Sequence, residues 1–412
     1  MDLNQVRRQF PALMQSVGGT APVFLDGPGG SQVPQSVLSA MSAYLGYFNS
    51  NLGGAFFSSD KTVSLMSEAR QAVADLLNSP SADQIVFGAN MTSLTFSFSR
   101  ALSREWQAGD EVIVTNADHY SNVSSWRQAA EDKGATVHAV RINETDCTLD
   151  LAHFKSLLNA KTKLVAVTYA SNTTGSINDI NRIVELAHQV GALVYVDAVH
   201  YAPHELIDVQ ALDCDFLACS AYKFFGPHVG IVYGKREHLE GFTPYKVEPA
   251  KDIIPGRWET GTQSFEGLAG VVAAIDYIAS LSEMSADTPR REKLIEAFAR
   301  TKAHEMQLSQ HFLTRLAEFK KIKLFGIESL ERLVERTPTF ALTFDDIEPR
   351  KVSEFLGKKH MCVWDGNFYA QGLCEQLGVM DKGGVVRVGC MHYNTIEELD
   401  SLFEAFTELL AE

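Results

Sequence analysis

Between about residues 80 and 235, short apolar runs alternate with longer amphipathic segments, and this alternation constrains the fold more than any other feature. The amphipathic segments 121–133 and 180–190 are followed by Gly134 and Gly191, as helices often are. The apolar runs have the length of buried strands: 85–87, 112–114, 136–140, 164–168, 193–196, 216–219 and 231–233. The pattern predicts an α/β fold, a mostly parallel, doubly wound sheet with helices on both faces, with ligands at the carboxyl ends of its strands.

The sequence pattern changes after Gly261. Segments 267–281 and 290–319 have the periodicity of long helices, and strands at 340–344 and 385–388 alternate with further helices in an α+β region. We therefore predict a large domain over residues 16–282 and a smaller C-terminal α+β domain over residues 283–412. Residues 1–15 are expected to pack with the smaller domain.

Charge and cysteine content exclude several classes of function. The chain carries 51 acidic and 36 basic residues, a net charge of −15, which repels phosphate backbones and argues against a nucleic-acid partner. Its six cysteines form no C-x-x-C pair, so neither a metal site nor a disulfide framework is expected. The first residues lack the apolar core of a signal peptide, and the most apolar stretch, 267–281, is too short to span a bilayer. We expect a cytoplasmic protein without membrane contact.

An acid and an amine follow two of the predicted strands. Asp197 ends the run 192–197, and Lys223 follows the run 215–220, 26 positions beyond Asp197. Adjacent parallel strands would bring both side chains to one edge of the sheet. A carboxylate in that position is costly to bury unless a cation pairs with it. A lysine for a Schiff base and an acid for a pyridinium nitrogen are what a pyridoxal phosphate enzyme needs.

These features resemble the cysteine desulfurase and class V aminotransferase family, pyridoxal phosphate enzymes of the aspartate aminotransferase fold (fold type I). The similarity extends over nearly the whole chain, and the matching segments occur in the order found in the family: 24–30, 90–93, 117–122, 171–175, Asp197, 220–223, 259–263 and 385–389. The resemblance implies pyridoxal 5'-phosphate as cofactor and a small amino acid as substrate.

The resemblance also implies roles for single residues. Met91 and Thr92 belong to the turn that holds the cofactor phosphate, which Ser220 also contacts. His119 stacks on the pyridine ring, and Lys223 forms the Schiff base. Asn172 lies near the phenolic oxygen and the substrate carboxylate. The catalytic set implied is Lys223, His119 and Asp197.

Two further residues carry implied contacts outside that set. Thr262 matches a threonine that reaches the phosphate of a partner subunit, which implies a homodimer with shared active sites. Arg387 matches the residue that binds the substrate α-carboxylate, for which a guanidinium fork is well suited.

Each of these residues has an ordinary alternative when taken alone. Thr92 or Ser93 as a plain helix cap, His119 as a polar loop residue, Asn172 as a turn residue and Arg387 as a surface-strand residue are all common.

The chain departs from the family at three positions around the expected site. His200 stands where desulfurases usually carry glutamine, and it is expected to contact the phenolic oxygen of the cofactor. Tyr222 replaces the usual histidine before the lysine, and it is expected to contact the cofactor. Tyr369, in the loop 366–371, occupies the position of the nucleophilic cysteine, and a phenol cannot carry sulfur as a persulfide. We expect Tyr369 to contact substrate instead.

The remaining cysteines near this region are expected to be unreactive. Cys374 lies five residues after Tyr369 in a predicted helix, where a buried thiol is usually a small apolar core residue. Cys362 and Cys390 flank apolar strands and are expected in the core as well.

The expected function is lyase-type chemistry on a small L-amino acid, C–S cleavage or β-elimination, without a standard persulfide relay. An aminotransferase or an amino-acid epimerase is the alternative, and a catalytically silent interaction partner is the non-enzyme alternative. Ser220-x-x-Lys223 also matches the first motif of penicillin-binding acyl enzymes, but the companion S-D-N and K-T-G motifs are absent from the sequence.

Overall fold

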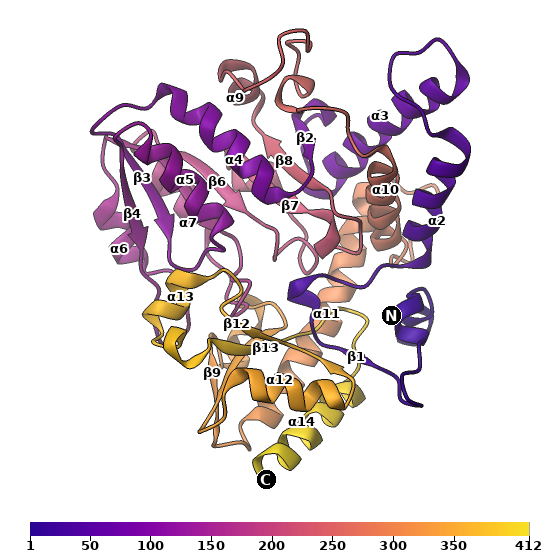
Figure 1. Ribbon diagram of the computed structural model, residues 1–412, viewed down its shortest axis with the longest axis vertical. Helices are drawn as coiled ribbons and strands as arrows, with labels where there is room; N and C mark the ends of the chain where they lie inside the picture. Colours follow the sequence, from indigo (N-terminus) through magenta and orange to yellow (C-terminus); the bar gives the residue numbers. More distant parts are fainter. Residues whose placement is uncertain (412) are drawn as a thin grey trace.

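The structure, a computed structural model, describes residues 1–411 and is organised around a seven-stranded sheet and a smaller four-stranded one (Figure 1). The large sheet has the strand order β2-β8-β7-β6-β5-β3-β4, and β8 alone runs against the others. Its strands are β2 (Ile85–Gly88), β3 (Glu111–Thr115), β4 (Thr136–Val140), β5 (Thr162–Thr168), β6 (Leu193–Asp197), β7 (Phe216–Ser220) and β8 (Gly230–Gly234). All seven apolar runs are therefore strands, and the predicted mostly parallel sheet is confirmed.

Helices cover both faces of the large sheet, because alternate side chains of its strands feed two separate apolar cores (Figure 1). One core holds α4 (Met91–Leu102) and α5 (Ser121–Glu131), with Phe98 and Trp126 fully buried. Helices that contribute to the opposite core include α3 (Phe57–Leu77), α6 (Leu151–Leu157), α7 (Ile180–His188), α8 (Val209–Leu212) and α10 (Phe265–Ala279). At the edges lie α2 (Gln35–Ala43), which packs on α10, and α9 (Arg236–Gly241).

The smaller sheet is antiparallel with the order β12-β13-β10-β9. Its strands are β9 (Ile322–Phe325), β10 (Thr339–Phe344), β12 (Trp364–Gly366) and β13 (Val385–Gly389). The helices of this region are α12 (Pro349–Lys358), α13 (Gln371–Gln376) and α14 (Ile396–Ala411), and the long α11 (Arg290–Leu316) leads into it. This sheet has its own apolar core, to which α11, α12 and α14 contribute.

The N-terminal segment contacts both regions. Phe10, after α1 (Leu3–Arg7), packs in the core that α3 and α10 share, whereas Arg7 makes an ion pair of 2.8 Å with Glu398 of α14. Further along, β1 (Val23–Phe24) pairs in parallel with β11 (Met361–Cys362). The division at residues 16 and 283 stays a prediction.

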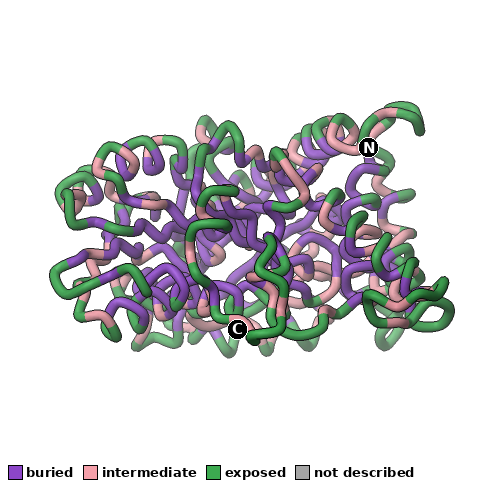
Figure 2. The backbone as a smooth tube through the Cα atoms, turned by 90° about the horizontal axis from the view of Figure 1, so that it is seen from above, coloured by how far each residue is buried: buried purple, intermediate pink, exposed green. Residues whose placement is uncertain are grey.

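Viewed from above, buried backbone runs through the middle of the molecule and is flanked by exposed segments (Figure 2). None of the helices in the described part of the chain is long and apolar enough to cross a membrane. The two predicted long helices are α10 and α11, and α10 begins two residues early because the Ser264 side chain accepts a hydrogen bond from Gly267 N at 3.3 Å and caps it.

Candidate active site

A cavity of about 110 Å³ lies at the carboxyl ends of the central strands, beside the start of α4. Because β6 and β7 are parallel neighbours, with Asp197 opposite Ala218, the end of each strand reaches the same edge of the sheet. The residues that line the cavity are Asn90, Met91, Thr92, His119, Ser121, Thr168, Asn172, Asp197, Val199, His200, Ser220, Tyr222 and Lys223. Nine of the residues proposed from the sequence are therefore brought together there; Thr262, Arg387 and Tyr369 are not among the lining residues.

Lys223 ends the short 3₁₀ turn that follows β7. Its amine donates a hydrogen bond to the carbonyl of Pro28, and Nζ lies 4.7 Å from the centre of the Tyr222 ring. Burial, with Arg387 as a second cause, lowers the pKa of Lys223 to about 7. A substantial share of the amine is therefore neutral, and nucleophilic, near neutral pH.

Asp197 is the last residue of β6 and is buried. Its Oδ1 accepts a hydrogen bond from Val199 N at 2.9 Å. Burial raises the pKa of Asp197 to about 6, while the Val199 hydrogen bond and the nearby Lys223 act in the opposite direction. One hydrogen bond and the nearby Lys223 offset only part of the cost of burying this carboxylate, so a cationic ring nitrogen is a good partner for it.

His119 presents a neutral ring to the cavity. Its Nδ1 accepts a hydrogen bond from Ser121 N at 3.1 Å, which leaves the proton of the neutral imidazole on Nε2. Burial and the charges of Lys223 and Arg387 lower the pKa of His119 to about 4. A flat, uncharged ring in this position can stack on an aromatic ligand.

The start of α4 forms one end of the cavity. Asn90 caps this helix, since its Oδ1 accepts a hydrogen bond from Ser93 N at 2.8 Å, so the alternative that Thr92 or Ser93 is the cap is wrong. Met91 N donates to Ser220 Oγ at 3.2 Å. A Cβ on Gly230 would lie 2.3 Å from the carbonyl carbon of Asn90, so only glycine lets β8 pack this closely. The result is a helix N-terminus with hydroxyl groups nearby, a suitable site for a phosphate.

Arg387 comes from β13 of the smaller sheet and is buried, so it is not a surface-strand residue. Its Nη1 donates to Asn172 O at 2.8 Å, and its guanidinium carbon lies 3.9 Å from the centre of the Phe368 ring. The Asn172 side chain in turn donates from Nδ2 to Phe368 O at 3.0 Å. Burial lowers the pKa of Arg387 to about 9, with partial compensation from Asp26, so the guanidinium stays charged at neutral pH.

The loop between β12 and α13 lies over this part of the site. Phe368 and Tyr369 both have left-handed backbone, with φ of 52° and 57°, a strained conformation for aromatic residues. Tyr369 O accepts a hydrogen bond from Tyr120 N at 2.7 Å. The side chain of Tyr369 is 73% exposed, and its ring centre lies 5.3 Å from that of His119. The loop thus connects the smaller sheet to residues beside the cavity.

None of the six cysteines lines the cavity. Cys374 is fully buried as predicted, and burial raises the pKa of its thiol to about 11. Cys390 is also buried, whereas the prediction for Cys362 is wrong, because this residue lies in the two-stranded β1–β11 sheet and is partly exposed.

The remaining proposed residues are His200, Tyr222 and Thr262, and each has a different environment. His200 is buried, with Nε2 facing hydroxyl groups from the smaller sheet region. The Tyr222 ring stacks on His228 with 4.9 Å between ring centres. Thr262 is exposed and lines a separate depression with Ser93 and Ser264.

Several polar groups around the cavity fit pyridoxal phosphate. Asn172 Oδ1, His200 Nδ1 and Arg387 Nε are buried without a hydrogen-bond partner among the described residues, and such groups call for a ligand or water. The α4 start suits the phosphate, Asp197 suits the pyridine nitrogen, and Lys223 is the amine that can bind the aldehyde. The residues present therefore match the functional groups of this cofactor.

Sequence reasoning missed residues that only the folded chain brings in. Pro28 supplies the carbonyl that holds Lys223, across 195 positions, and Phe368 covers Arg387. Thr337 and Thr339 contact His200 from 137 and 139 positions away. Thr337 and Thr339 lie outside every segment singled out from the sequence, whereas Pro28 and Phe368 lie within the segments 24–30 and 366–371 but had no role assigned. Ser121 likewise lies within the segment 117–122 that carries His119.

Comparison with known proteins gives a consistent assignment. The model of the family described as Aminotransferase class-V matches residues 23–402. The chain is 32% identical over 421 residues to a probable cysteine desulfurase of Halalkalibacterium halodurans, covering 98% of this chain and 96% of that protein. It is also 32% identical over 417 residues to the aminotransferase-like protein FGM3 of Gibberella zeae, covering 99% and 98%.

A solved structure shows that the similarity includes the fold. The cysteine desulfurase CsdA from Escherichia coli superimposes with a TM-score of 0.85 at 26% identity, covering 100% of this chain and 99% of that one. The fold is thus fold type I of pyridoxal phosphate enzymes, as the resemblance implied. The chain belongs to the class V aminotransferase family, among the cysteine desulfurase-like members, and is a pyridoxal phosphate-dependent enzyme.

Proposed function

We propose that the protein cleaves a small L-amino acid in a lyase-type reaction, C–S cleavage or β-elimination, without passing sulfur to a cysteine of its own. One observation carries this proposal: Lys223 and Asp197 share a cavity beside Arg387, yet no cysteine lines it. The proposed catalytic residues are Lys223, Asp197 and His119.

Lys223 is the proposed proton carrier. When bound, pyridoxal phosphate would supply an electron sink for the pair released at the substrate Cα. The Lys223 amine, with a pKa of about 7, takes the Cα proton as general base and returns a proton as general acid. Asp197 holds a proton on the pyridine nitrogen by supplying the opposite charge. The neutral ring of His119 would stack on the cofactor and help to hold it.

Arg387 and Asn172 form the proposed binding site for the substrate carboxylate. A guanidinium binds a carboxylate through two parallel hydrogen bonds, and Arg387 Nε has no partner among the described residues. Phe368 covers the guanidinium and excludes water, which strengthens such an ion pair.

Tyr369 stands at the position expected for a sulfur-accepting cysteine, and a phenol cannot form a persulfide. Cys374 is nearby in sequence but is fully buried, and its raised pKa disfavours the thiolate that would attack sulfur. Sulfur released from a substrate would leave as a small product. An aminotransferase or an epimerase remains the second candidate, since the loop without a thiol suits either and one relative is named aminotransferase-like.

The experiment that tests this function is a panel of L-amino acids added to the purified enzyme. We expect a change in the visible spectrum with at least one small amino acid, together with release of ammonia and a keto acid. Sulfide in addition would identify C–S cleavage. Amino-group transfer to a keto acid or loss of optical activity would instead favour the second candidate. No response across the panel would contradict the proposal.

The same samples test the absence of a relay. After incubation with cysteine, intact-protein mass spectrometry should show no added sulfur on the chain. The matched control is Cys374→Ser, which we expect to keep the turnover of the unmodified chain and, like it, to gain no sulfur during the incubation. Sulfur bound at Cys374 would overturn this part of the proposal.

We further propose a homodimer with shared active sites. Large apolar side chains are exposed around α2 and the start of α3, among them Leu45, Tyr47, Phe56 and Phe57, and α10, which packs on both helices, begins just after Thr262. An apolar surface of this kind marks a protein interface. Sedimentation should give twice the 45.4 kDa of the chain, and Tyr47→Lys with Phe57→Lys should shift it toward monomer. A monomer in the unmodified protein would contradict the proposed role of Thr262.

A cytoplasmic location fits the chemistry of the cysteines. All six are free thiols, and a reducing compartment keeps them so. We therefore propose this location for the enzyme.

A further inference from the structure

His200 has one engaged and one free ring nitrogen. Its Nε2 lies 3.1 Å from Thr337 Oγ1 and 3.1 Å from Thr339 Oγ1. Its Nδ1 is buried and has no hydrogen-bond partner among the described residues. Since His200 lines the cavity, Nδ1 is the nitrogen left for a bound molecule.

The two hydroxyl groups differ in where their protons can go. Thr337 Oγ1 also lies 3.4 Å from Gly175 O, so this hydroxyl has a carbonyl to which it can donate. For the Thr339 hydroxyl, His200 Nε2 is the partner that the described residues provide, and Thr339 is fully buried. A buried hydroxyl proton is costly to leave unpaired, so Thr339 donates to Nε2. A neutral imidazole that accepts at Nε2 carries its proton on Nδ1.

His200 stays neutral, so its ring carries a single proton, and that proton lies on Nδ1. Burial lowers the pKa of His200 well below its usual range, and His204, Arg387 and Lys223 act in the same direction. The His204 ring centre lies 5.3 Å from that of His200, and its Nδ1 lies 2.9 Å from Glu305 Oε2 behind the site. A second proton on His200 would face the charges of Arg387 and Lys223 in a buried position.

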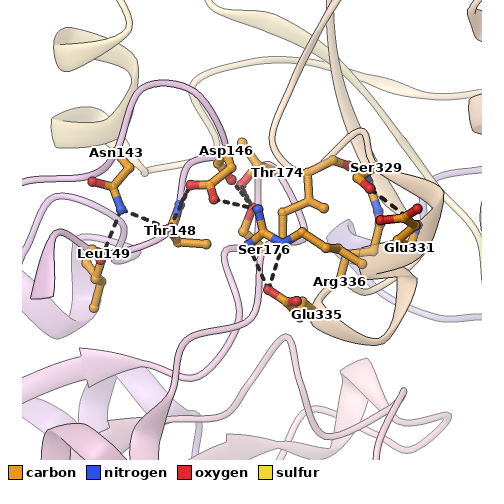
Figure 3. A network of polar contacts seen from close by, with 12 residues as sticks. Asn143, Asp146, Thr148, Leu149, Thr174, Ser176, Ser329, Glu331, Glu335 and Arg336 are labelled. Carbon is orange, nitrogen blue, oxygen red and sulfur yellow. Dashed lines mark hydrogen bonds and ion pairs between the residues drawn. The ribbon is translucent and has the colours of Figure 1, made fainter.

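The segment that carries the two threonines is firmly held. Arg336 is buried and donates to the carbonyls of Ile327, Thr337 and Thr339, the last at 2.6 Å. A polar network ties the preceding turn to loops of the large sheet (Figure 3). Arg332 of this turn makes ion pairs with Asp146 at 2.9 Å and with Glu335 at 2.7 Å. These contacts fix the position from which the Thr339 hydroxyl meets His200.

We propose that Thr339 is a positioning residue that holds His200 in the Nδ1–H form, so that His200 offers a hydrogen-bond donor to an acceptor oxygen in the cavity. This inference rests on the proposed function, in which that oxygen is the phenolic oxygen of pyridoxal phosphate. A donor stabilises the ionised form of such an oxygen, whereas the Nε2–H form would present only a lone pair.

The test is nitrogen NMR of the full-length holoenzyme labelled at histidine, which distinguishes the two neutral forms of an imidazole. We expect the Nδ1–H form for His200, assigned by the signal lost in His200→Gln. Thr339→Val keeps the shape but removes the donor, and we expect the Nε2–H form to become populated. Thr339→Ser should restore the original form, and Thr337→Val is the matched control that should leave it unchanged.

Kinetics give a second readout. We expect Thr339→Val to lower kcat/KM about tenfold, the effect of one lost hydrogen bond, with recovery in Thr339→Ser. An Nε2–H signal in the unmodified enzyme, or equal effects of Thr337→Val and Thr339→Val, would overturn the inference. Failure of the proposed function is distinguishable, since the NMR assignment does not depend on whether any amino acid reacts.

Discussion

Lys223→Ala is expected to abolish the visible colour of the enzyme and to lower kcat by about 10⁴-fold or more, since covalent attachment of the cofactor and proton transfer at Cα are lost together. No other lysine lines the cavity within the described residues, so no second amine can replace it. The fold should survive, because the side chain makes one hydrogen bond, to Pro28, and its removal relieves the burial of an amine.

The measurement combines absorbance, borohydride treatment and peptide mass spectrometry. Borohydride should bleach the unmodified enzyme and attach the cofactor irreversibly to residue 223, and it should attach nothing in the variant. Lys251→Ala, at an exposed lysine, is the matched control and should keep both colour and turnover. Retained colour in Lys223→Ala, or a label at another lysine, would refute the central assignment.

Asp197→Asn is expected to lower kcat/KM by about 10²- to 10³-fold, the usual effect of removing one preorganised charge from a buried site. The amide has nearly the same shape, so the hydrogen bond from Val199 N can persist, but it cannot balance a proton on the pyridine nitrogen. The matched control is Asp213→Asn, which changes an exposed acid in the connection between β6 and β7 and should have little effect on kcat/KM.

The pH dependence of cofactor binding distinguishes the contribution of Asp197 from that of Lys223. Asp197 has a pKa of about 6 in the free site, so below pH 6 it is protonated and cannot pair with a cationic ring. Lys223 becomes neutral as the pH rises through about 7. Affinity for pyridoxal phosphate should therefore rise through both values in the unmodified protein. In Asp197→Asn only the rise near 7 should remain, and an unchanged profile would contradict the role of Asp197.

The strands of the large sheet and the ends of β6 and β7 were predictable because the sequence pattern that marks them extends over only a few residues. Runs of apolar residues a few positions long identify buried strands, and a charged residue directly after such a run lies at the strand end. Asp197 and Lys223 were therefore placed at one edge of the sheet from the sequence, and the structure brings them to one cavity. Ser220 ends β7, and His119 and Asn172 come four residues after the ends of β3 and β5.

Contacts between segments far apart in the sequence could not be predicted in this way. The burial of Arg387 against Phe368, the Pro28 carbonyl on Lys223 and the Thr339 hydroxyl on His200 join residues that are 19 to 195 positions apart. Their geometry depends on how distant segments pack in the folded chain, and no short pattern encodes it.

The amino-acid sequence by itself determined the sheet, its ligand-binding edge and the amine and acid that stand there, because hydrophobic periodicity acts over a few residues. Only the tertiary structure decided which groups surround that pair: the covered guanidinium of Arg387, the strained loop at Tyr369 and the protonation of His200. These follow from burial and from the pairing of polar groups across the whole chain, and those forces act only once distant segments are packed together.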